Sequence, residues 1–420
     1  MKKIALLYPG QGSQYVGMGR EFYERYKVFR ETFEEASEVL GFNIGKLCLE
    51  GDIKKLTMTE NTQPAILTMG FAMFKVYMEE IGIEPSYMAG HSLGEITALT
   101  CAGAIRFCDA LTIVRNRGKF MQEAAAQGVG AMAAISNLDV SIIEELCSIY
   151  KDNGRLVVVS NYNSPSQTVI SGYKEFVREV SDKLEQKGGQ VSELSVSAPF
   201  HSPLMKSAAE KLEQELIKYK YEEPKYPVIT NVTAMPYENS SEVVGNLIRQ
   251  IVEPVRWQET IEYLDEQAIQ IAIELGPKKV LTKLMKKNSN KIVAYSYDDN
   301  EEVKKLKDDI SLISNVKENR MRFLTRSMAI AVCTKNNNWN NDEYKRGVIE
   351  PYKKVQNIQV ELEKAAKEPT MRHMEEALEM LMSVFRTKGT SVEEQNERLN
   401  QLFNETGTRN LFLDFITQNS

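Results

Sequence analysis

The stretch from residue 87 to residue 104 constrains the fold of this chain more than any other. An apolar approach leads into Gly90-His91-Ser92-Leu93-Gly94, which has the pattern Gly-x-Ser-x-Gly, and a helix-like run follows from 95 to 104. A serine on a tight strand-to-helix turn, with a glycine two residues to either side, is typical of a nucleophile elbow. The helix would direct unpaired backbone N–H groups at an oxyanion formed beside the serine. A Gly-Ser-rich turn without chemistry is the alternative, but the flanking strand and helix favour Ser92 as a nucleophile.

A serine nucleophile of the usual kind needs a histidine base, and the chain has three histidines, at 91, 201 and 373. His201 is the predicted base, because prolines on both sides restrict the backbone of its loop. His91 should project away from its neighbour Ser92 across the sharp turn. His373 lies in a helical region without a nearby cluster of ligand residues, so we expect a hydrogen-bonded or exposed side chain there.

The bulk properties narrow the class of protein. A chain of 420 residues exceeds one compact core, so two or three domains are expected. The 42% hydrophobic and 26% charged residues indicate a globular protein, and the net charge of -6 disfavours nucleic acid as the main partner. No apolar stretch approaches membrane-spanning length, so no membrane partner is expected. Five scattered cysteines without a Cys-x-x-Cys pair predict neither disulfides nor a metal site, and indicate a cytoplasmic protein.

The order of predicted elements indicates an α/β protein with an insertion. A strand at 4–8 is followed by a loop whose glycines lack the spacing of a nucleotide-binding motif, and which we expect to approach the active site closely. Helical patterns cover 20–40, 64–81 and 108–125. The next six elements have the β-α-β-β-α-β order of a ferredoxin-like fold: 131–135, 140–150, 156–161, 168–171, 174–186 and 190–196.

Alternating elements resume after the insertion, which predicts a mostly parallel sheet covered on both faces. They are helices at 204–218, 242–252 and 257–264, and strands at 228–231 and 269–275. From about residue 300 the pattern is all-helical. Apolar stripes predict a helix that begins with Pro351 near its N-terminus and another from Met371 to Phe385, and Ser391 is the capping residue of a third.

Several of these motifs occur together in one known family. They are Pro9–Gln14, Thr62–Ala65 (expected late in a strand), Gly90–Glu95, Val114–Gly118, Asn161–Gln167, the pair Phe200-His201, and Glu274–Pro277. By these motifs, over about residues 1–290, the chain resembles malonyl-CoA:acyl carrier protein transacylases of fatty-acid synthesis. Within this family it is closest in type to the stand-alone (trans-acting) acyltransferases of polyketide synthases, which it also resembles.

The resemblance implies an α/β-hydrolase-like parallel-sheet domain at 1–127 and 197–300, with a ferredoxin-like subdomain at 128–196 inserted in it. An all-helical C-terminal extension at 301–420 lies outside the family pattern. It could dock a carrier protein or synthase, or could stabilise the catalytic body.

The resemblance also implies a function and roles. Ser92 would attack the thioester of malonyl-CoA while His201 takes its proton, and backbone N–H groups of Gln11 and Leu93 would hold the oxyanion. The backbone carbonyl at Gln250 would orient the histidine, with no acidic triad member. The malonyl group would then pass from Ser92 to the phosphopantetheine thiol of an acyl carrier protein. No metal and no bound cofactor are implied.

The predicted substrate-binding residues are Arg117, Phe200, Gln63 and Asn163. Arg117 would form a bidentate pair with the free malonyl carboxylate. A Phe before the histidine goes with malonyl in the polyketide relatives, although Pro199 stands where their common pattern has alanine.

Two alternatives stay open: an editing hydrolase that clears acyl groups from carrier proteins, and a non-catalytic docking subunit. The Arg117 clamp argues against the first and the intact site residues against the second. A polyketide pathway is favoured over fatty-acid synthesis by the extension and by the Phe200-His201 pair.

Overall fold

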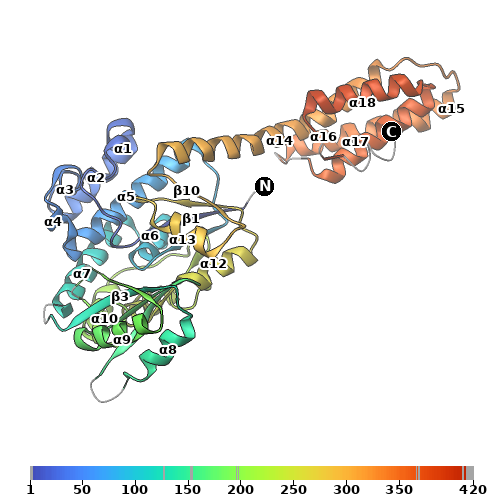
Figure 1. The fold of residues 1–420 in the computed structure, drawn as a ribbon. Coiled ribbons are helices and arrows are strands. Elements are labelled where there is room, and N and C mark those ends of the chain that lie inside the picture. The colour runs from blue at the N-terminus through green and yellow to red at the C-terminus, as the bar shows by residue number, and fades with distance from the viewer. Residues whose placement is uncertain are drawn as a thin grey trace. The chain divides into compact units, whose positions relative to one another are not determined.

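The computed structural model describes residues 3–125, 128–151, 155–194, 196, 198–365, 367, 369–408 and 411–412, with the side chains of 311–319 excepted. The chain divides into two compact units, Met1–Leu306 and Lys307–Ser420, each of which is described by itself (Figure 1).

A five-stranded parallel sheet forms the centre of the first unit. Its strand order is β10-β9-β1-β2-β7, and every neighbouring pair is parallel. The strands are β1 (Ile4–Tyr8), β2 (Tyr87–Gly90), β7 (Val228–Ile229), β9 (Ile271–Glu274) and β10 (Val293–Ser296). Because a parallel sheet is buried on both faces, β1 reads as an uninterrupted apolar run rather than an alternating one.

Helices cover both faces of this sheet. Ala5 and Leu7 of β1 point to the side on which Trp257 of α12 (Trp257–Glu266) and Leu281 of α13 (Val280–Asn288) are packed. The opposite side carries Tyr8, against which α5 (Thr59–Glu80) packs, and α6 (Leu93–Cys101). The other helices of this part are α1 (Arg20–Arg25), α2 (Lys27–Leu40), α3 (Ile44–Glu50), α4 (Ile53–Thr57), α7 (Phe107–Ala125), α10 (Lys206–Leu216) and α11 (Glu242–Val252).

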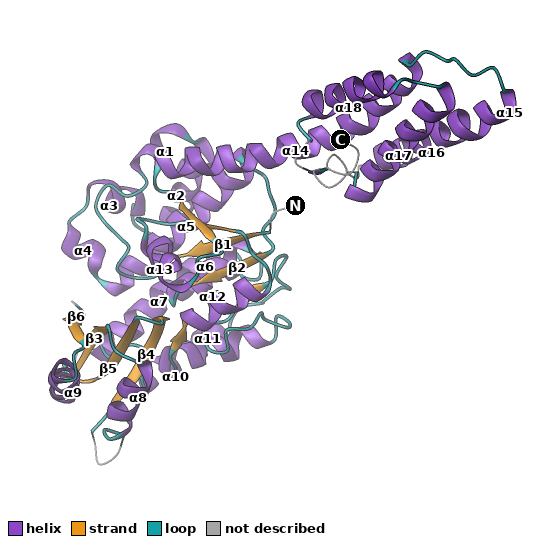
Figure 2. Ribbon diagram, turned by 45° about the vertical axis from the view of Figure 1, so that its right-hand side comes forward, coloured by secondary structure: helices purple, strands orange, loops and turns teal. Residues whose placement is uncertain are grey.

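The inserted segment forms the second sheet, in the order β6-β3-β5-β4-β8 (Figure 2). Its elements are β3 (Gly130–Ser136), α8 (Val140–Ser148), β4 (Val157–Ser164), β5 (Gln167–Tyr173), α9 (Lys174–Gln186) and β6 (Gln190–Glu193). The pairs β3–β5, β3–β6 and β4–β5 are antiparallel, so the predicted ferredoxin-like order is confirmed. The fifth strand, β8 (Val255–Arg256), comes from outside the insertion and pairs parallel with β4.

The structure corrects two sequence predictions in the first unit. Thr62–Ala65 does not lie late in a strand: it is inside α5, which begins at Thr59 rather than at Pro64. Pro64 is the sixth residue of α5, so its missing N–H leaves the carbonyl of Glu60 without its intrahelical donor. The predicted helix at 20–40 is two helices, because Tyr26 is extended at φ −110° and ψ 124°.

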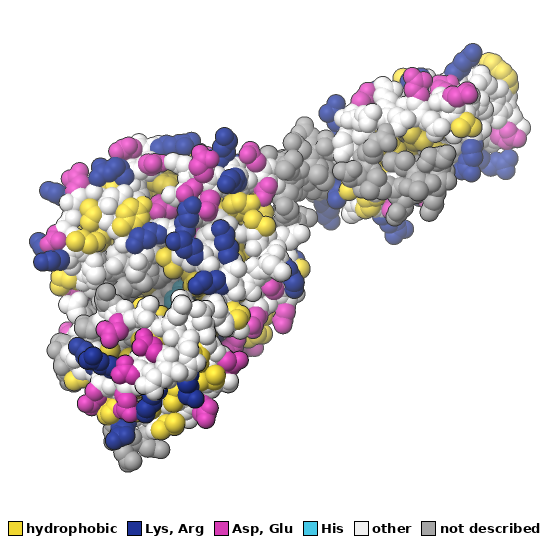
Figure 3. Space-filling model, in the orientation of Figure 1, with side chains coloured by type: hydrophobic (Ala, Val, Ile, Leu, Met, Phe, Trp, Pro, Cys, Tyr) yellow, Lys and Arg dark blue, Asp and Glu magenta, His cyan; other side chains and the backbone are white. Residues whose placement is uncertain are grey.

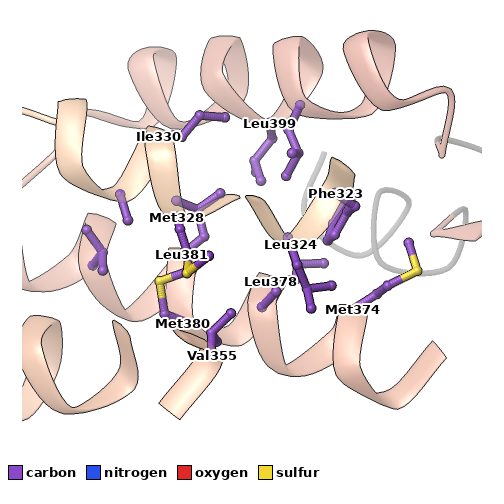
Figure 4. Packing of buried hydrophobic residues seen from close by; sticks show 14 of the residues in the cluster. Phe323, Leu324, Met328, Ile330, Val355, Met374, Leu378, Met380, Leu381 and Leu399 are labelled. Carbon is purple, nitrogen blue, oxygen red and sulfur yellow. The ribbon is translucent and has the colours of Figure 1, made fainter. Parts of the chain in front are cut away.

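The second unit is helical and has a core of its own. Its elements are the greater part of α14 (Asn300–Cys333), then α15 (Asn341–Tyr344), a π-helical segment (Lys345–Ile349), α16 (Glu350–Lys364), α17 (Met371–Lys388) and α18 (Val392–Thr406). The predicted apolar stripes meet in one cluster, in which Leu324 of α14, Val355 of α16, Leu381 of α17 and Leu399 of α18 are buried (Figure 4). Ser391 caps α18 by accepting from the backbone of Glu394, as predicted.

His373, which was expected to be hydrogen-bonded or exposed, lies in the first turn of α17. Nδ1 of His373 accepts a hydrogen bond from the backbone N–H of Thr370 at 3.2 Å, so this histidine has a local structural partner. Over the part of the chain that the structure describes, we find no helix with the length and apolarity needed to cross a membrane. The domain boundaries predicted from the sequence stay a prediction.

Candidate functional site

Ser92 lies at the sharp turn between β2 and α6. Its backbone has φ 53° and ψ −108°, a conformation that an L-residue rarely adopts, so the turn is strained. The flanking glycines are required by close packing: a Cβ on Gly90 would lie 1.9 Å from the carbonyl carbon of Gly94, and one on Gly94 would lie 1.9 Å from the carbonyl oxygen of Tyr8. The predicted elbow geometry is therefore present, and it presents the Ser92 hydroxyl at the N-terminus of α6.

His201 reaches Ser92 from the loop that precedes α10. Its Nε2 lies 2.9 Å from Ser92 Oγ, and its Nδ1 lies 2.7 Å from the backbone carbonyl oxygen of Gln250. A carbonyl can only accept, so Nδ1 carries the proton and Nε2 is left as the acceptor for the serine hydroxyl. Burial, together with the nearby positive charge of Arg117, lowers the pKa of His201 to about 3, so the imidazole is neutral at pH 7. The arrangement holds the ring in the tautomer that a base needs.

Arg117 of α7 lies beneath the serine and is 2% exposed. Its Nη2 donates to Ser92 Oγ at 3.2 Å and to the side-chain oxygen of Gln250 at 2.9 Å, and its Nη1 donates to Gln63 Oε1 at 2.9 Å. Burial lowers the pKa of Arg117 to about 10, and the guanidinium still carries its charge at neutral pH. Its Nε has no hydrogen-bond partner among the described residues, and no described carboxylate forms an ion pair with it. A buried cation with a free donor edge is suited to bind an anion.

A buried polar network behind the serine was not predicted. Asn231 Oδ1 accepts from the backbone N–H of Ser92 at 2.6 Å, and its Nδ2 donates to the carbonyl of Gly90 at 2.7 Å. The Gln250 side chain donates to the carbonyl of Ser92 at 3.0 Å and to Glu95. Asn231 is 139 residues from Ser92 in the chain, so no local pattern in the sequence could have indicated it.

The two predicted oxyanion residues both border the serine. Gln11 and Leu93 line the same cavity of about 180 Å³ as Ser92 and His201. The loop that carries Gln11 lies directly on the elbow, since a Cβ on Gly10 would approach the carbonyl oxygen of His91 to 2.5 Å. Leu93 is the first residue of α6, where a backbone N–H has no partner within the helix.

Three further predicted residues fall around this cavity in different ways. Phe200 is half-buried and also lines an adjoining groove of about 680 Å³. Gln63 holds Arg117 rather than lining the cavity. Asn163 Oδ1 lies 2.9 Å from Nε2 of His91, and this hydrogen bond holds the His91 ring away from the serine. Figure 3 shows the surface of the first unit hollowed between the parallel-sheet part and the ferredoxin-like subdomain, with a histidine visible there.

A second groove, of about 410 Å³, opens from the other side of Gln11 and His91. It is lined by Lys278, Lys279, Lys283 and Lys287, so its surface is basic. Within the described residues, no group of three or more His, Cys, Asp or Glu side chains is arranged to hold a metal ion.

The sequence of this chain is similar to those of known acyltransferases. Residues 5–333 match the acyl transferase domain family. A Bacillus subtilis malonyl CoA-acyl carrier protein transacylase is 37% identical over 395 residues, which cover 94% of this chain and 99% of the relative. The transacylase of Escherichia coli K12 is 43% identical over 288 residues, 68% of this chain and 93% of the relative. The Bacillus subtilis alignment thus includes most of the C-terminal helical unit, whereas the 288 residues of the Escherichia coli alignment are too few to cover both units in full.

Solved structures agree with the sequence matches. The malonyl CoA-acyl carrier protein transacylase of Coxiella burnetii superposes with a TM-score of 0.71 at 39% identity and covers 73% of this chain and 96% of its own. A malonyl-transacylase solved in complex with a type II polyketide synthase acyl-carrier protein gives a TM-score of 0.70 at 40% identity, over 71% of this chain and 97% of its own. The chain therefore belongs to the malonyl CoA-acyl carrier protein transacylase family of acyl transferase domains.

Proposed function

We propose that this protein is an [acyl-carrier-protein] S-malonyltransferase that works through a malonyl ester of Ser92. The observation that carries the proposal is the position of Ser92 Oγ, which lies 2.9 Å from a neutral histidine nitrogen and 3.2 Å from a buried guanidinium. A base beside the hydroxyl supports acyl transfer, and a fixed cation supports an acyl group that ends in a carboxylate.

The proposed reaction has two halves, of which the first loads Ser92. Ser92 Oγ attacks the thioester carbonyl of malonyl-CoA as His201 Nε2 takes the hydroxyl proton. The carbonyl oxygen becomes an oxyanion that the backbone N–H groups of Gln11 and Leu93 bind in this proposal, and each such donor contributes about 10²- to 10³-fold in rate. The tetrahedral intermediate collapses, the C–S bond breaks, and the proton on His201 passes to the leaving coenzyme A sulfur.

The second half-reaction reverses these steps with a different thiol. His201 takes the proton of the phosphopantetheine thiol on an acyl carrier protein, and the sulfur attacks the malonyl ester. The ester bond to Ser92 breaks and the proton returns to its oxygen. The chain's relatives include a malonyl-transacylase solved in complex with an acyl-carrier protein, which supports this acceptor.

Arg117 provides the selection for malonyl in this proposal. The malonyl carboxylate binds along the free Nε and the adjacent Nη2, and displaces the contact between Nη2 and the serine hydroxyl. Gln63 accepts from Nη1 and Gln250 accepts from Nη2, and both keep the guanidinium in place. Phe200 at the cavity wall limits the space beside the malonyl methylene.

Intact-mass measurement tests the function. The wild-type protein with malonyl-CoA should gain one malonyl group, Ser92→Ala should gain none, and acetyl-CoA should give little adduct. If wild-type protein forms no malonyl adduct and instead releases free acid from neutral acyl carriers, the protein is an editing hydrolase and the proposal is wrong.

We infer further that the acceptor belongs to a polyketide synthase. The Phe200-His201 pair and the C-terminal helical unit support this assignment. Transfer rates to holo carrier proteins of the two pathways, measured side by side, test it. A higher rate with the fatty-acid carrier protein would contradict it.

A further inference from the structure

Glu95 is a fully buried carboxyl group that the proposed reaction does not use. It is the third residue of α6 and is 0% exposed. Its Oε2 accepts from Gln250 Nε2 at 2.5 Å and from the backbone N–H of Asn231 at 3.1 Å, and its Oε1 accepts from the Tyr237 hydroxyl. No described lysine or arginine forms an ion pair with it. The positive charge that acts on it is that of Arg117, and Gln250 lies between the two groups. A buried carboxyl without a direct ion pair is costly, so its retention beside the active site needs an explanation.

Its hydrogen bonds connect it to both sides of the candidate nucleophile. Gln250, which donates its amide N–H to Glu95, accepts from Arg117 Nη2 at 2.9 Å through the amide oxygen. Asn231, whose backbone donates to Glu95, accepts from the backbone N–H of Ser92 at 2.6 Å. Every atom bound to Oε2 is a donor, so the carboxyl fixes which end of the Gln250 amide faces Arg117.

We propose that Glu95 is a positioning residue: by holding Gln250 and Asn231 it keeps Arg117 and Ser92 at the spacing that malonyl transfer requires. The inference rests on the proposed function, since it concerns the same Ser92 ester. It assigns Glu95 no contact with substrate. Displacement of a binding group by about 1 Å is enough to lower a rate on the order of 10²-fold.

The hydrogen bonds of Glu95 depend on the length of its side chain and not on its charge. Burial raises the pKa of Glu95 to about 7, so the protonated group is well populated at neutral pH. In that form one oxygen still accepts from Gln250 and Asn231, while the other donates to Tyr237, whose hydroxyl can accept. A glutamine at this position can make the same three contacts. An aspartate keeps the carboxyl but withdraws it by about 1.5 Å, which takes it out of hydrogen-bond range of Gln250.

The test compares Glu95→Asp and Glu95→Gln with wild type, using the full chain. The initial rate of Ser92 acylation is measured by mass with malonyl-CoA and with acetyl-CoA, and the melting temperature is measured for each variant. Tyr237→Phe is the matched control, because it removes the contact to Oε1 and leaves both contacts to Oε2.

We expect Glu95→Asp to lower malonyl loading by about 10-fold or more and to lower the ratio of malonyl to acetyl loading, because Arg117 is displaced. Glu95→Gln and Tyr237→Phe should stay within about 3-fold of wild type in that ratio. A purely structural role would lower both substrates together at a constant ratio, and a charge effect would make Glu95→Gln the worse variant; either result overturns the inference. If wild-type protein forms no malonyl ester at all, the proposed function fails and this inference fails with it.

Discussion

Replacing Arg117 by alanine should slow the transfer of malonyl much more than the transfer of a neutral acyl group. The guanidinium is 2% exposed, and one of its donor atoms, Nε, has no partner among the described residues. Hydrogen bonds to charged groups contribute about 1.5–3 kcal/mol each, and a buried site screens them little. Loss of the pair to the carboxylate should therefore cost about 3 kcal/mol, which is on the order of 10²-fold in malonyl loading.

The assay is the second-order rate of Ser92 acylation with malonyl-CoA and acetyl-CoA. Malonyl loading should fall on the order of 10²-fold in Arg117→Ala, while acetyl loading should change by less than about 3-fold. Arg115→Ala is the matched control: Arg115 is on the same helix, but it donates to the carbonyl of Leu40 and stacks on Phe42, away from the cavity. An equal loss with both substrates, or an unchanged malonyl rate, would refute the carboxylate clamp.

The pKa of His201 lies far below that of an ordinary histidine, and a base works only when it is neutral. The acylation rate should therefore stay constant as pH falls through 6.5 and should decline only near pH 3–4. A single midpoint between pH 6 and 7 in the acylation rate, without a matching loss of folded protein, would contradict this. Gly94→Ala should abolish acylation or folding, because its Cβ would lie 1.9 Å from a backbone oxygen. Gly245→Ala, in a helix with open space around it, should instead raise the free energy of unfolding in urea by about 1 kcal/mol. Equal effects of the two substitutions would contradict the tight packing at Gly94 and the open space at Gly245. Lys388 is 3% exposed and donates to two backbone carbonyls at the end of α14, each at 2.8 Å. Lys388→Met should therefore speed hydrogen exchange in α17 and leave malonyl loading unchanged, whereas unaltered exchange would show that these contacts stabilise little.

The parts of the site that depend on neighbouring residues could be read from the sequence. The spacing of Gly90, Ser92 and Gly94 predicts a strand, a strained turn and a helix because all three constraints act within one turn of chain. The ferredoxin-like order was predicted for a similar reason: each of its strands and helices is long enough to show its own period.

Long-range contacts and short elements were missed. Strand β7 falls within the strand predicted at 228–231, but β8 was not predicted. It has two residues, too few to show an alternation, and it joins a sheet formed by another part of the chain. Gln63 was expected late in a strand because the motif was read without its helical surroundings, and it lies in α5 facing Arg117.

The sequence by itself determined the elbow, the identity of a histidine partner, the alternating α/β order and the helical character of the C-terminal unit, since local geometry and hydrophobic period fix these features. The tertiary structure alone decided that Asn231, Gln250 and Glu95 converge behind Ser92. Their hydrogen bonds join residues as much as 158 positions apart, and such pairs leave no periodic signal in a single chain. Only folding brings these polar groups together, because each of them, once buried, requires a partner that the local sequence does not supply.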